Sequence, residues 1–92
     1  MTINYVYIIE CGDESLYTGW TNNLEKRFKA HNEGRGAKYT RGRGPLKLVY
    51  FEEYESKVDA MKREYAIKKM TREKKIELIS NNKMKSIICN KM

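Results

Sequence analysis

The chain has few cysteines, a single proline and no long apolar run. Its two cysteines, Cys11 and Cys89, are far apart and lack the close spacing of metal-ligating pairs. This excludes a disulfide-stapled scaffold and favours free thiols in a reducing compartment. No stretch approaches the roughly 18 apolar residues of a membrane span, and no basic segment followed by an apolar run opens the chain. We therefore expect a cytoplasmic protein.

Acidic residues are absent from residues 34–50, which contain five basic residues. The formal net charge of the chain is +7. By contrast, residues 1–33 contain three basic and five acidic residues, and residues 51–92 contain eleven and seven. Lysine and arginine attract a polyanion because they release the counterions condensed on its phosphates. The basic segment therefore favours nucleic acid as a partner, although a solvated loop that only aids solubility has the same composition.

Ninety-two residues make one domain with a single hydrophobic core. Runs of β-branched and aromatic residues predict strands, and polar caps before periodic segments predict helices. The expected strands are 3–9, 16–20 and 46–54, and the expected helices are 23–32, 57–69 and 71–79. The order β-β-α-β-α-α predicts an α/β fold of the α+β type, a three-stranded sheet with helices packed on it. We expect this domain to span residues 1–80, with a polar tail at 81–92.

Helix boundaries follow from capping residues. Thr21 or Asn22 is suited to cap the first helix, which Gly34 would end. Ser56 is suited to cap the second helix, and Thr71 to start the third. Residues 34–45 between the first helix and the third strand are rich in glycine and predict a loop.

Polar residues share helix faces with apolar ones. Leu24, Arg27, Phe28 and His31 follow the spacing of one helix face. On the next helix, Glu64 lies between two apolar stripes, which places it toward the packed side. These stripes comprise Val58, Met61 and Tyr65, and Ala60 and Ile67.

Two tripeptides near the start carry the strongest signal. They are Tyr5-Val6-Tyr7 and Tyr17-Thr18-Gly19, and Arg27, His31 and Glu64 follow them in order. This order resembles the GIY-YIG nuclease family, and in particular its short stand-alone bacterial subfamily. The resemblance covers roughly residues 4–80 and implies a small, largely antiparallel sheet flanked by helices. Both tripeptides depart from the family's letters, but they keep its two key tyrosines, Tyr7 and Tyr17.

The resemblance implies that Tyr7 acts as general base or positions the attacking water, and that Tyr17 supports the water and phosphate. A phenol with a pKa of about 10 is a poor base at neutral pH. His31, with an ordinary pKa of about 6.5, accepts a proton more readily. The choice between Tyr7 and His31 as general base is left open by the sequence. For Tyr50 and Tyr54 we expect sheet packing with hydroxyls that reach solvent.

Arg27 is suited to bind phosphoryl oxygens, because its planar fork stays charged. Glu64 is the candidate metal ligand, since one carboxylate can anchor a Mg²⁺ that takes its other ligands from water and phosphate. Structural alternatives exist for each residue: an Arg27 ion pair, a half-buried His31, and a Glu64–Lys68 helix pair. The tyrosine motifs favour the catalytic interpretation.

The basic loop is expected to form the DNA groove. Its candidate DNA-binding residues are Arg35, Lys38, Tyr39, Thr40, Arg41 and Arg43. Members of the resembled family often carry an asparagine after the glutamate. Here residues 71–75 contain none, but a lysine in this stretch is suited to contact phosphate, and Asn81 and Asn82 come later.

These observations favour a metal-dependent endonuclease that hydrolyses phosphodiester bonds in DNA with Mg²⁺ or Mn²⁺. The single domain leaves no room for a separate specificity domain, so selection of a DNA structure, or a protein partner that supplies specificity, is expected. A role in DNA repair or processing follows. The alternatives are a non-catalytic nucleic-acid-binding module with this fold and, less favoured, a small interaction protein whose charge is incidental.

Overall fold

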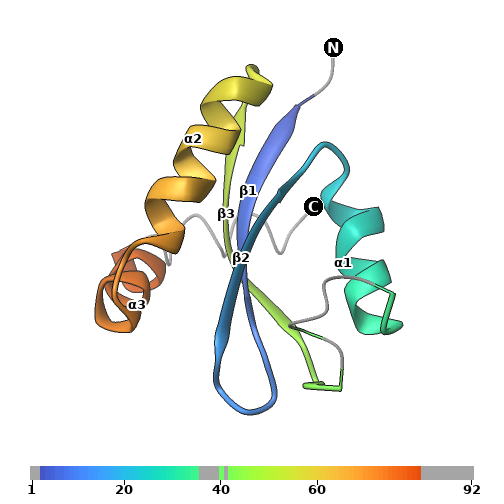
Figure 1. Ribbon diagram of the computed structural model, residues 1–92. Coiled ribbons are helices and arrows are strands. Elements are labelled where there is room, and N and C mark those ends of the chain that lie inside the picture. Colours follow the sequence, from blue (N-terminus) through green and yellow to red (C-terminus); the bar gives the residue numbers. More distant parts are fainter. Residues whose placement is uncertain (1–2, 36–39, 41, 82–92) are drawn as a thin grey trace.

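The computed structural model describes residues 3–35, 40 and 42–81. Its elements follow the predicted order β-β-α-β-α-α (Figure 1). They are β1 (Asn4–Glu10), β2 (Leu16–Thr21), α1 (Leu24–Asn32), β3 (Lys47–Tyr54), α2 (Lys57–Lys68) and α3 (Arg72–Asn81). The predicted α+β fold is therefore confirmed, with element bounds within two residues of those expected. The polar tail beyond Asn81 lies outside the described residues.

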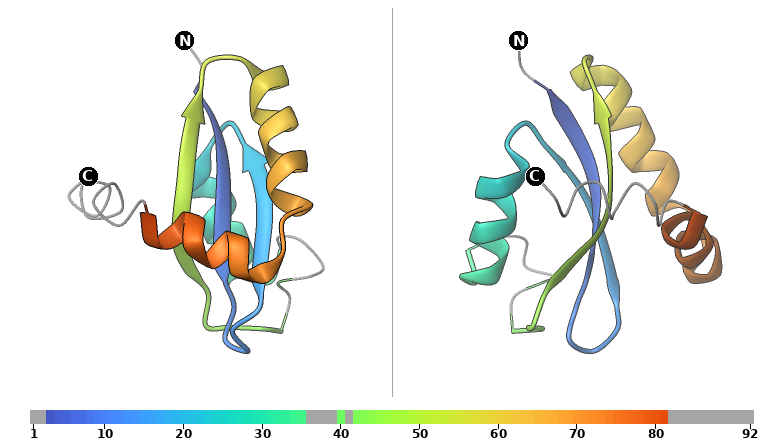
Figure 2. Two further views of the ribbon diagram at one scale, coloured as in Figure 1. Left: turned by 90° about the vertical axis from the view of Figure 1, so that its left-hand side faces the viewer. Right: turned by 180° about the vertical axis from the view of Figure 1, so that it is seen from behind.

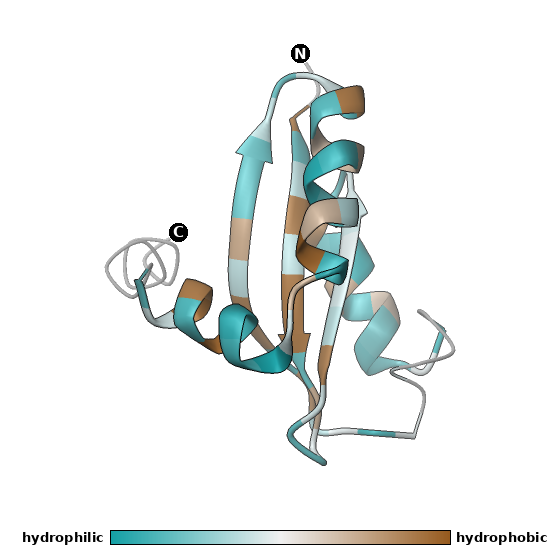
Figure 3. Cartoon of the chain, turned by 60° about the vertical axis from the view of Figure 1, so that its left-hand side comes forward, coloured by the Kyte–Doolittle hydropathy of each residue, from teal (hydrophilic) through white to brown (hydrophobic). Residues whose placement is uncertain are grey.

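The three strands form one antiparallel sheet in the order β2-β1-β3. The central strand β1 alternates its side chains between two covered faces, and brown apolar segments recur along it in Figure 3. Val6 and Ile8 are fully buried and pack with Ala60 and Ile67 of α2. Tyr7 points to the other face and contacts His31 of α1. The sheet therefore separates α1 from α2 and α3, and β2 is one of its two edges (Figures 1 and 2).

The helices begin at side-chain caps. The Asn23 side chain accepts from the Lys26 amide, so Asn23 caps α1 in place of the predicted Thr21 or Asn22. Thr21 instead accepts the amide of Asn23 and holds the turn that precedes the helix. Gly34 follows α1 with a φ of 77°, a conformation that favours glycine and ends helices.

The other two helices begin at the capping residues that the sequence predicts. Ser56 accepts from the Asp59 amide at the start of α2. Thr71 accepts from the Lys74 amide at the start of α3. None of the three described helices has the length and apolar composition needed to cross a lipid bilayer.

One of the two apolar stripes predicted on α2 does not pack against the core. Val58, Met61 and Tyr65 are 58%, 45% and 62% exposed, whereas Ala60 and Ile67 are fully buried. The stripe of Ala60 and Ile67 lies on the sheet, and the opposite side of the helix therefore points outward. Because only one stripe packs, the rotation of α2 is set by Ala60 and Ile67.

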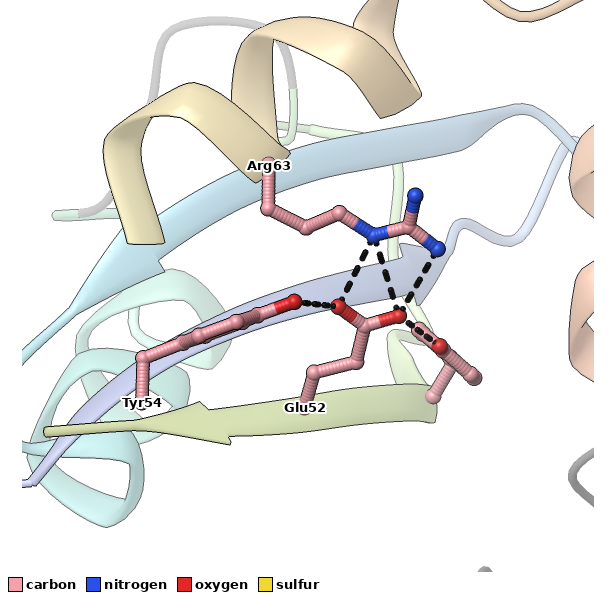
Figure 4. Close-up of polar contacts among 4 residues, drawn as sticks. Glu52, Tyr54 and Arg63 are labelled. Carbon is pink, nitrogen blue, oxygen red and sulfur yellow. Dashed lines mark hydrogen bonds and ion pairs between the residues drawn. The ribbon is translucent and has the colours of Figure 1, made fainter. Parts of the chain in front are cut away.

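A polar network joins β3 to α2 (Figure 4). Arg63 reaches from α2 to Glu52, with its Nε 2.9 Å from Oε1 and its Nη2 3.0 Å from Oε2. The hydroxyls of Tyr50 and Tyr54 donate to the same carboxylate. Both side chains pack on the sheet face that α2 covers, as predicted. Tyr50 is 4% exposed, so the prediction that its hydroxyl reaches solvent is wrong, whereas Tyr54 is half-buried.

We expect this network to make stability depend on pH. Burial alone would raise the pKa of Glu52, but Arg63 and the two hydroxyls lower it below its ordinary value of 4.5. The network therefore stabilises the fold fully above pH 4.5, the ordinary pKa of the carboxyl. This stabilisation is lost as the pH falls through the lowered pKa of Glu52. Glu52→Gln should reduce the free energy of unfolding by about 1–3 kcal/mol at pH 7 and flatten its acid dependence.

Urea denaturation at pH 7 and pH 3 measures both effects, with Glu53→Gln at the exposed neighbouring position as control. Equal acid dependence of wild type and Glu52→Gln would show that the network does not couple to folding.

Candidate active site

The centre of the sheet positions Tyr7 over a glycine. Tyr7 is 1% exposed and lies opposite Gly19 of β2 in the antiparallel register. A Cβ on Gly19 would stand 2.6 Å from Tyr7 Oη and 2.8 Å from its Cζ. The phenol therefore passes over the position where any other residue would place a side chain. The glycine of the second tripeptide is required for this close approach.

Tyr17 lies beside Tyr7 on the same face. Tyr17 precedes Gly19 by two positions on β2, and Gly19 lies opposite Tyr7. The side chains of Tyr17 and Tyr7 therefore both project toward α1. The ring centroids of Tyr17 and Tyr7 are 6.3 Å apart, and those of Tyr17 and His31 are 5.4 Å apart. The structure thus brings the two motif tyrosines and the helix histidine into one aromatic cluster.

His31 is held on both sides of its ring. It is 1% exposed, with Nε2 3.0 Å from Tyr7 Oη and Nδ1 2.8 Å from Thr40 Oγ1. Thr40 itself is 2% exposed. A residue predicted as a DNA contact therefore orients the histidine from inside the protein. The sequence has no signal for this contact, because it depends on how the loop returns to α1.

Arg27 completes the cluster from the preceding turn of α1. Its hydrogen bond to Tyr7 raises the pKa of the guanidinium. Burial raises the pKa of Tyr7, which Arg27 only partly offsets. Burial, and then the charge of Arg27, lower the pKa of His31. At neutral pH the site therefore contains a charged arginine, a neutral phenol and a neutral imidazole.

The donors and acceptors around His31 suggest a direction for its two hydrogen bonds. We assign the Tyr7 proton to the contact with His31 Nε2, because the charged Arg27 beside Tyr7 offers no acceptor. His31 Nδ1–H then donates to Thr40 Oγ1. This order gives a continuous path along which a proton can move from Tyr7 to His31.

Glu64 approaches from α2, on the other side of the sheet. Its side chain is 19% exposed and lies 3.4 Å from Lys68 Nζ. Its negative charge contributes to the raised pKa of Tyr7, so it reaches the cluster electrostatically. Within residues 3–35, 40 and 42–81, no three His, Cys, Asp or Glu side chains gather as a metal cage. Of the residues that the sequence predicts for this site, Glu64 supplies the carboxylate suited to a metal.

The structure describes part of the basic loop. Arg35 is exposed and pairs with Glu33, and Arg43 Nη1 lies 2.5 Å from Asp13 Oδ2. Lys38, Tyr39 and Arg41 lie outside the described residues, as does Asn82. Asn81 ends α3 at the surface.

Known proteins resemble this chain in sequence and in fold. Residues 3–77 match the family model of the GIY-YIG catalytic domain. A UPF0213 protein of Clostridium perfringens is 70% identical, covering 90% of this chain and 89% of that protein. A UPF0213 protein of Syntrophus aciditrophicus is 55% identical, with 89% and 95% covered.

Two solution NMR structures are similar. One is a UPF0213 protein from Bacillus halodurans, 51% identical with a TM-score of 0.57, covering 85% of this chain and 83% of that one. The other is a protein from E. faecalis, 36% identical with a TM-score of 0.63, covering 91% and 90%. The family expected from the two tripeptides is confirmed: this chain belongs to the GIY-YIG catalytic-domain family.

Proposed function

We propose that the protein is a metal-dependent endonuclease that hydrolyses phosphodiester bonds in DNA. The observation that carries this proposal is the convergence of Tyr7, Tyr17, Arg27 and His31 in one hydrogen-bonded and aromatic cluster. Phosphodiester hydrolysis requires a positioned water, a route for its proton and a cation on the phosphoryl oxygens. The cluster supplies the first two and, through Arg27, the third.

The hydrogen-bond path favours a shared role for Tyr7 and His31 as base. Tyr7 Oη takes the proton of the attacking water while its own proton passes to His31 Nε2, 3.0 Å away. Burial and Arg27 weaken His31 as a base in the free protein. A bound phosphate would offset the charge of Arg27 and so raise the basicity of His31, while the effect of burial would remain. Thr40 keeps the imidazole oriented for this transfer.

Tyr17 and Arg27 are proposed to hold the phosphate. The guanidinium matches two phosphoryl oxygens and stays charged when its surroundings are partly dry. Its interaction with the Tyr7 hydroxyl, which raises the pKa of the guanidinium, is consistent with a place beside the attacking water. Tyr17 packs against both Tyr7 and His31, so its hydroxyl is suited to support the water or the phosphate.

A single carboxylate at Glu64 fits a hard divalent cation. Mg²⁺ and Mn²⁺ accept one carboxylate with waters and substrate phosphate as the other ligands, in contrast to zinc, which needs several protein ligands. When bound, the ion would stabilise negative charge on the phosphoryl and leaving oxygens. Lys68, 3.4 Å from Glu64, would turn away or bind the phosphate instead.

The basic loop is proposed to bind the DNA backbone, with Thr40 removed from the predicted contacts because it is buried. The proposed contacts are Arg35, Lys38, Tyr39, Arg41 and Arg43. We also propose that the enzyme selects a DNA structure, or takes its specificity from a protein partner, and that it acts in DNA repair or processing in the cytoplasm.

A panel of DNAs tests the proposal. Purified protein is incubated with single-stranded, duplex, flapped and branched DNA in Mg²⁺, Mn²⁺ or EDTA. We expect products only with a divalent metal and with one DNA structure preferred. DNA binding without cleavage under every condition would favour the alternative, a non-catalytic nucleic-acid-binding module. That alternative is supported by the charge of the basic loop alone.

Neutralising the basic loop should weaken DNA binding and flatten its salt dependence. A variant with Arg35, Lys38, Arg41 and Arg43 changed to glutamine loses up to four phosphate contacts. Each lost contact reduces the slope of log affinity against log salt by about 0.9 for duplex DNA.

The control changes the exposed Lys62 and Lys74 to glutamine, outside the loop. Fluorescence anisotropy from low to high salt provides the measurement. An unchanged affinity and slope in the loop variant would refute this role.

A further inference from the structure

A second basic site lies on the opposite face of β2 from Tyr17. A pocket of about 220 Å³ is lined by Ser15, Leu16, Arg72 and Lys75. Ser15 and Leu16 are where β2 begins, and Arg72 and Lys75 belong to the first turn of α3. Figure 2 shows α3 crossing the sheet on the same side as α2.

Arg72 is tied to the hairpin between β1 and β2. Its Nη1 donates to the carbonyl oxygen of Glu14 at 2.6 Å. This bond uses one donor of the guanidinium and fixes its position at the pocket. Its other N–H groups have no carboxylate partner among the described residues.

Lys75 is the unusual member of the pocket. It is half-buried and forms no ion pair within the part of the chain that the structure describes. Burial, and then the charge of Lys68, lower its pKa. Half-burying a cation beside another cation destabilises a fold. An anion that binds in the pocket would remove that cost.

The pocket is connected to the candidate active site by charge. Lys68 lies 3.4 Å from Glu64 on one side and acts on Lys75 on the other. Leu16, in the pocket wall, is followed directly by Tyr17 of the aromatic cluster. Because successive side chains of a strand point to opposite faces, a ligand in the pocket would lie across the edge strand β2 from a phosphate held at the cluster.

We propose that Arg72 and Lys75, beside Ser15, bind a backbone phosphate of the nucleic-acid substrate on the other side of β2 from the phosphate that is cleaved. The proposal rests on the proposed function for its substrate class. It predicts different roles for the two adjacent lysines of α3: Lys75 lines the pocket and binds phosphate, whereas Lys74 is exposed and lies outside the pocket. The substrate strand would then pass over the β2 edge, between the basic loop and α3.

Lys75→Gln and its matched control Lys74→Gln test the pocket. Binding to a labelled oligonucleotide is measured in EDTA, so that cleavage plays no part. Lys75→Gln should lower affinity several-fold and reduce the salt slope by about 0.7–0.9, the value of one phosphate contact. Lys74→Gln should change both clearly less, and Lys75→Arg should retain binding.

Thermal unfolding separates binding from a structural role. Lys75→Gln removes repulsion with Lys68, so its Tm should be equal to or above that of wild type while its affinity falls. Equal effects of the Lys74 and Lys75 variants, or unchanged affinity in Lys75→Gln, would overturn the proposal. A wild type that binds no oligonucleotide overturns it as well.

Amide chemical shifts identify the source of the phosphate. The oligonucleotide should shift residues 14–16 and 72–75 at a concentration at which inorganic phosphate does not. Equal shifts with inorganic phosphate would assign the pocket to the free ion and contradict the proposal. Failure of the nuclease proposal is distinct: wild type then binds DNA through Lys75 but cleaves nothing with any metal.

Discussion

Glu64→Gln is expected to reduce metal-dependent DNA cleavage by about a thousandfold or more. The substitution keeps the shape of the side chain and removes the carboxylate that we propose as the metal ligand. A loss of several kcal/mol of transition-state stabilisation corresponds to this factor. DNA affinity without metal should be equal or tighter, because one negative charge near the phosphates is gone.

Single-turnover cleavage and anisotropy binding on one DNA panel, with and without Mg²⁺, measure both effects. Glu77→Gln, at an exposed helical position, is the control for loss of one carboxylate. Folding should survive, since a Glu64–Lys68 pair on a helix surface contributes little. If Glu64→Gln cleaves at the wild-type rate, Glu64 does not hold the metal. If wild type cleaves nothing and both bind DNA identically, the binding module is the better interpretation.

Gly19→Ala should reduce cleavage by about a hundredfold or more through one added methyl group. The new Cβ would stand 2.6 Å from Tyr7 Oη and 3.1 Å from Tyr17 Cε2, so the phenols must move. Tyr7 then leaves its 3.0 Å contact with His31. Displacement of about 1 Å at a reacting group is enough for such a loss. Overpacking should also lower the free energy of unfolding by about 1–3 kcal/mol.

Gly44→Ala is the matched control, because no atom lies within 4 Å of a Cβ at that position. Cleavage rates and urea denaturation of both variants are compared with Tyr7→Phe, which lacks only the hydroxyl. Gly19→Ala and Tyr7→Phe act through the same contact, so the double variant should be little worse than the worse single variant. A folded Gly19→Ala that cleaves normally would mean that the Tyr7–His31 contact is dispensable.

Local patterns in the sequence determined the elements and their order. Side chains two apart in a strand, or three and four apart in a helix, share a face whatever the rest of the chain does. This is why the strands, the helices and the shared face of Arg27 and His31 were predictable. The two tripeptides, followed in order by Arg27, His31 and Glu64, also resemble the family to which the chain belongs.

Only the tertiary structure decided what each face meets. Val58, Met61 and Tyr65 form a regular stripe, yet they point outward because Ala60 and Ile67 occupy the one position against the sheet. The periodicity of a single helix cannot choose between two apolar stripes, because the choice depends on the surface that it packs against.

The polar contacts were decided in the same way. The contacts of Thr40 with His31, of Gly19 with Tyr7, and of Arg72 with the carbonyl of Glu14 all join different segments of the chain. Residue type indicates that a threonine can bond and a lysine can bind phosphate. Which of them is buried, paired or left facing a pocket follows from how the loop, β2 and α3 pack, and no local pattern encodes that packing.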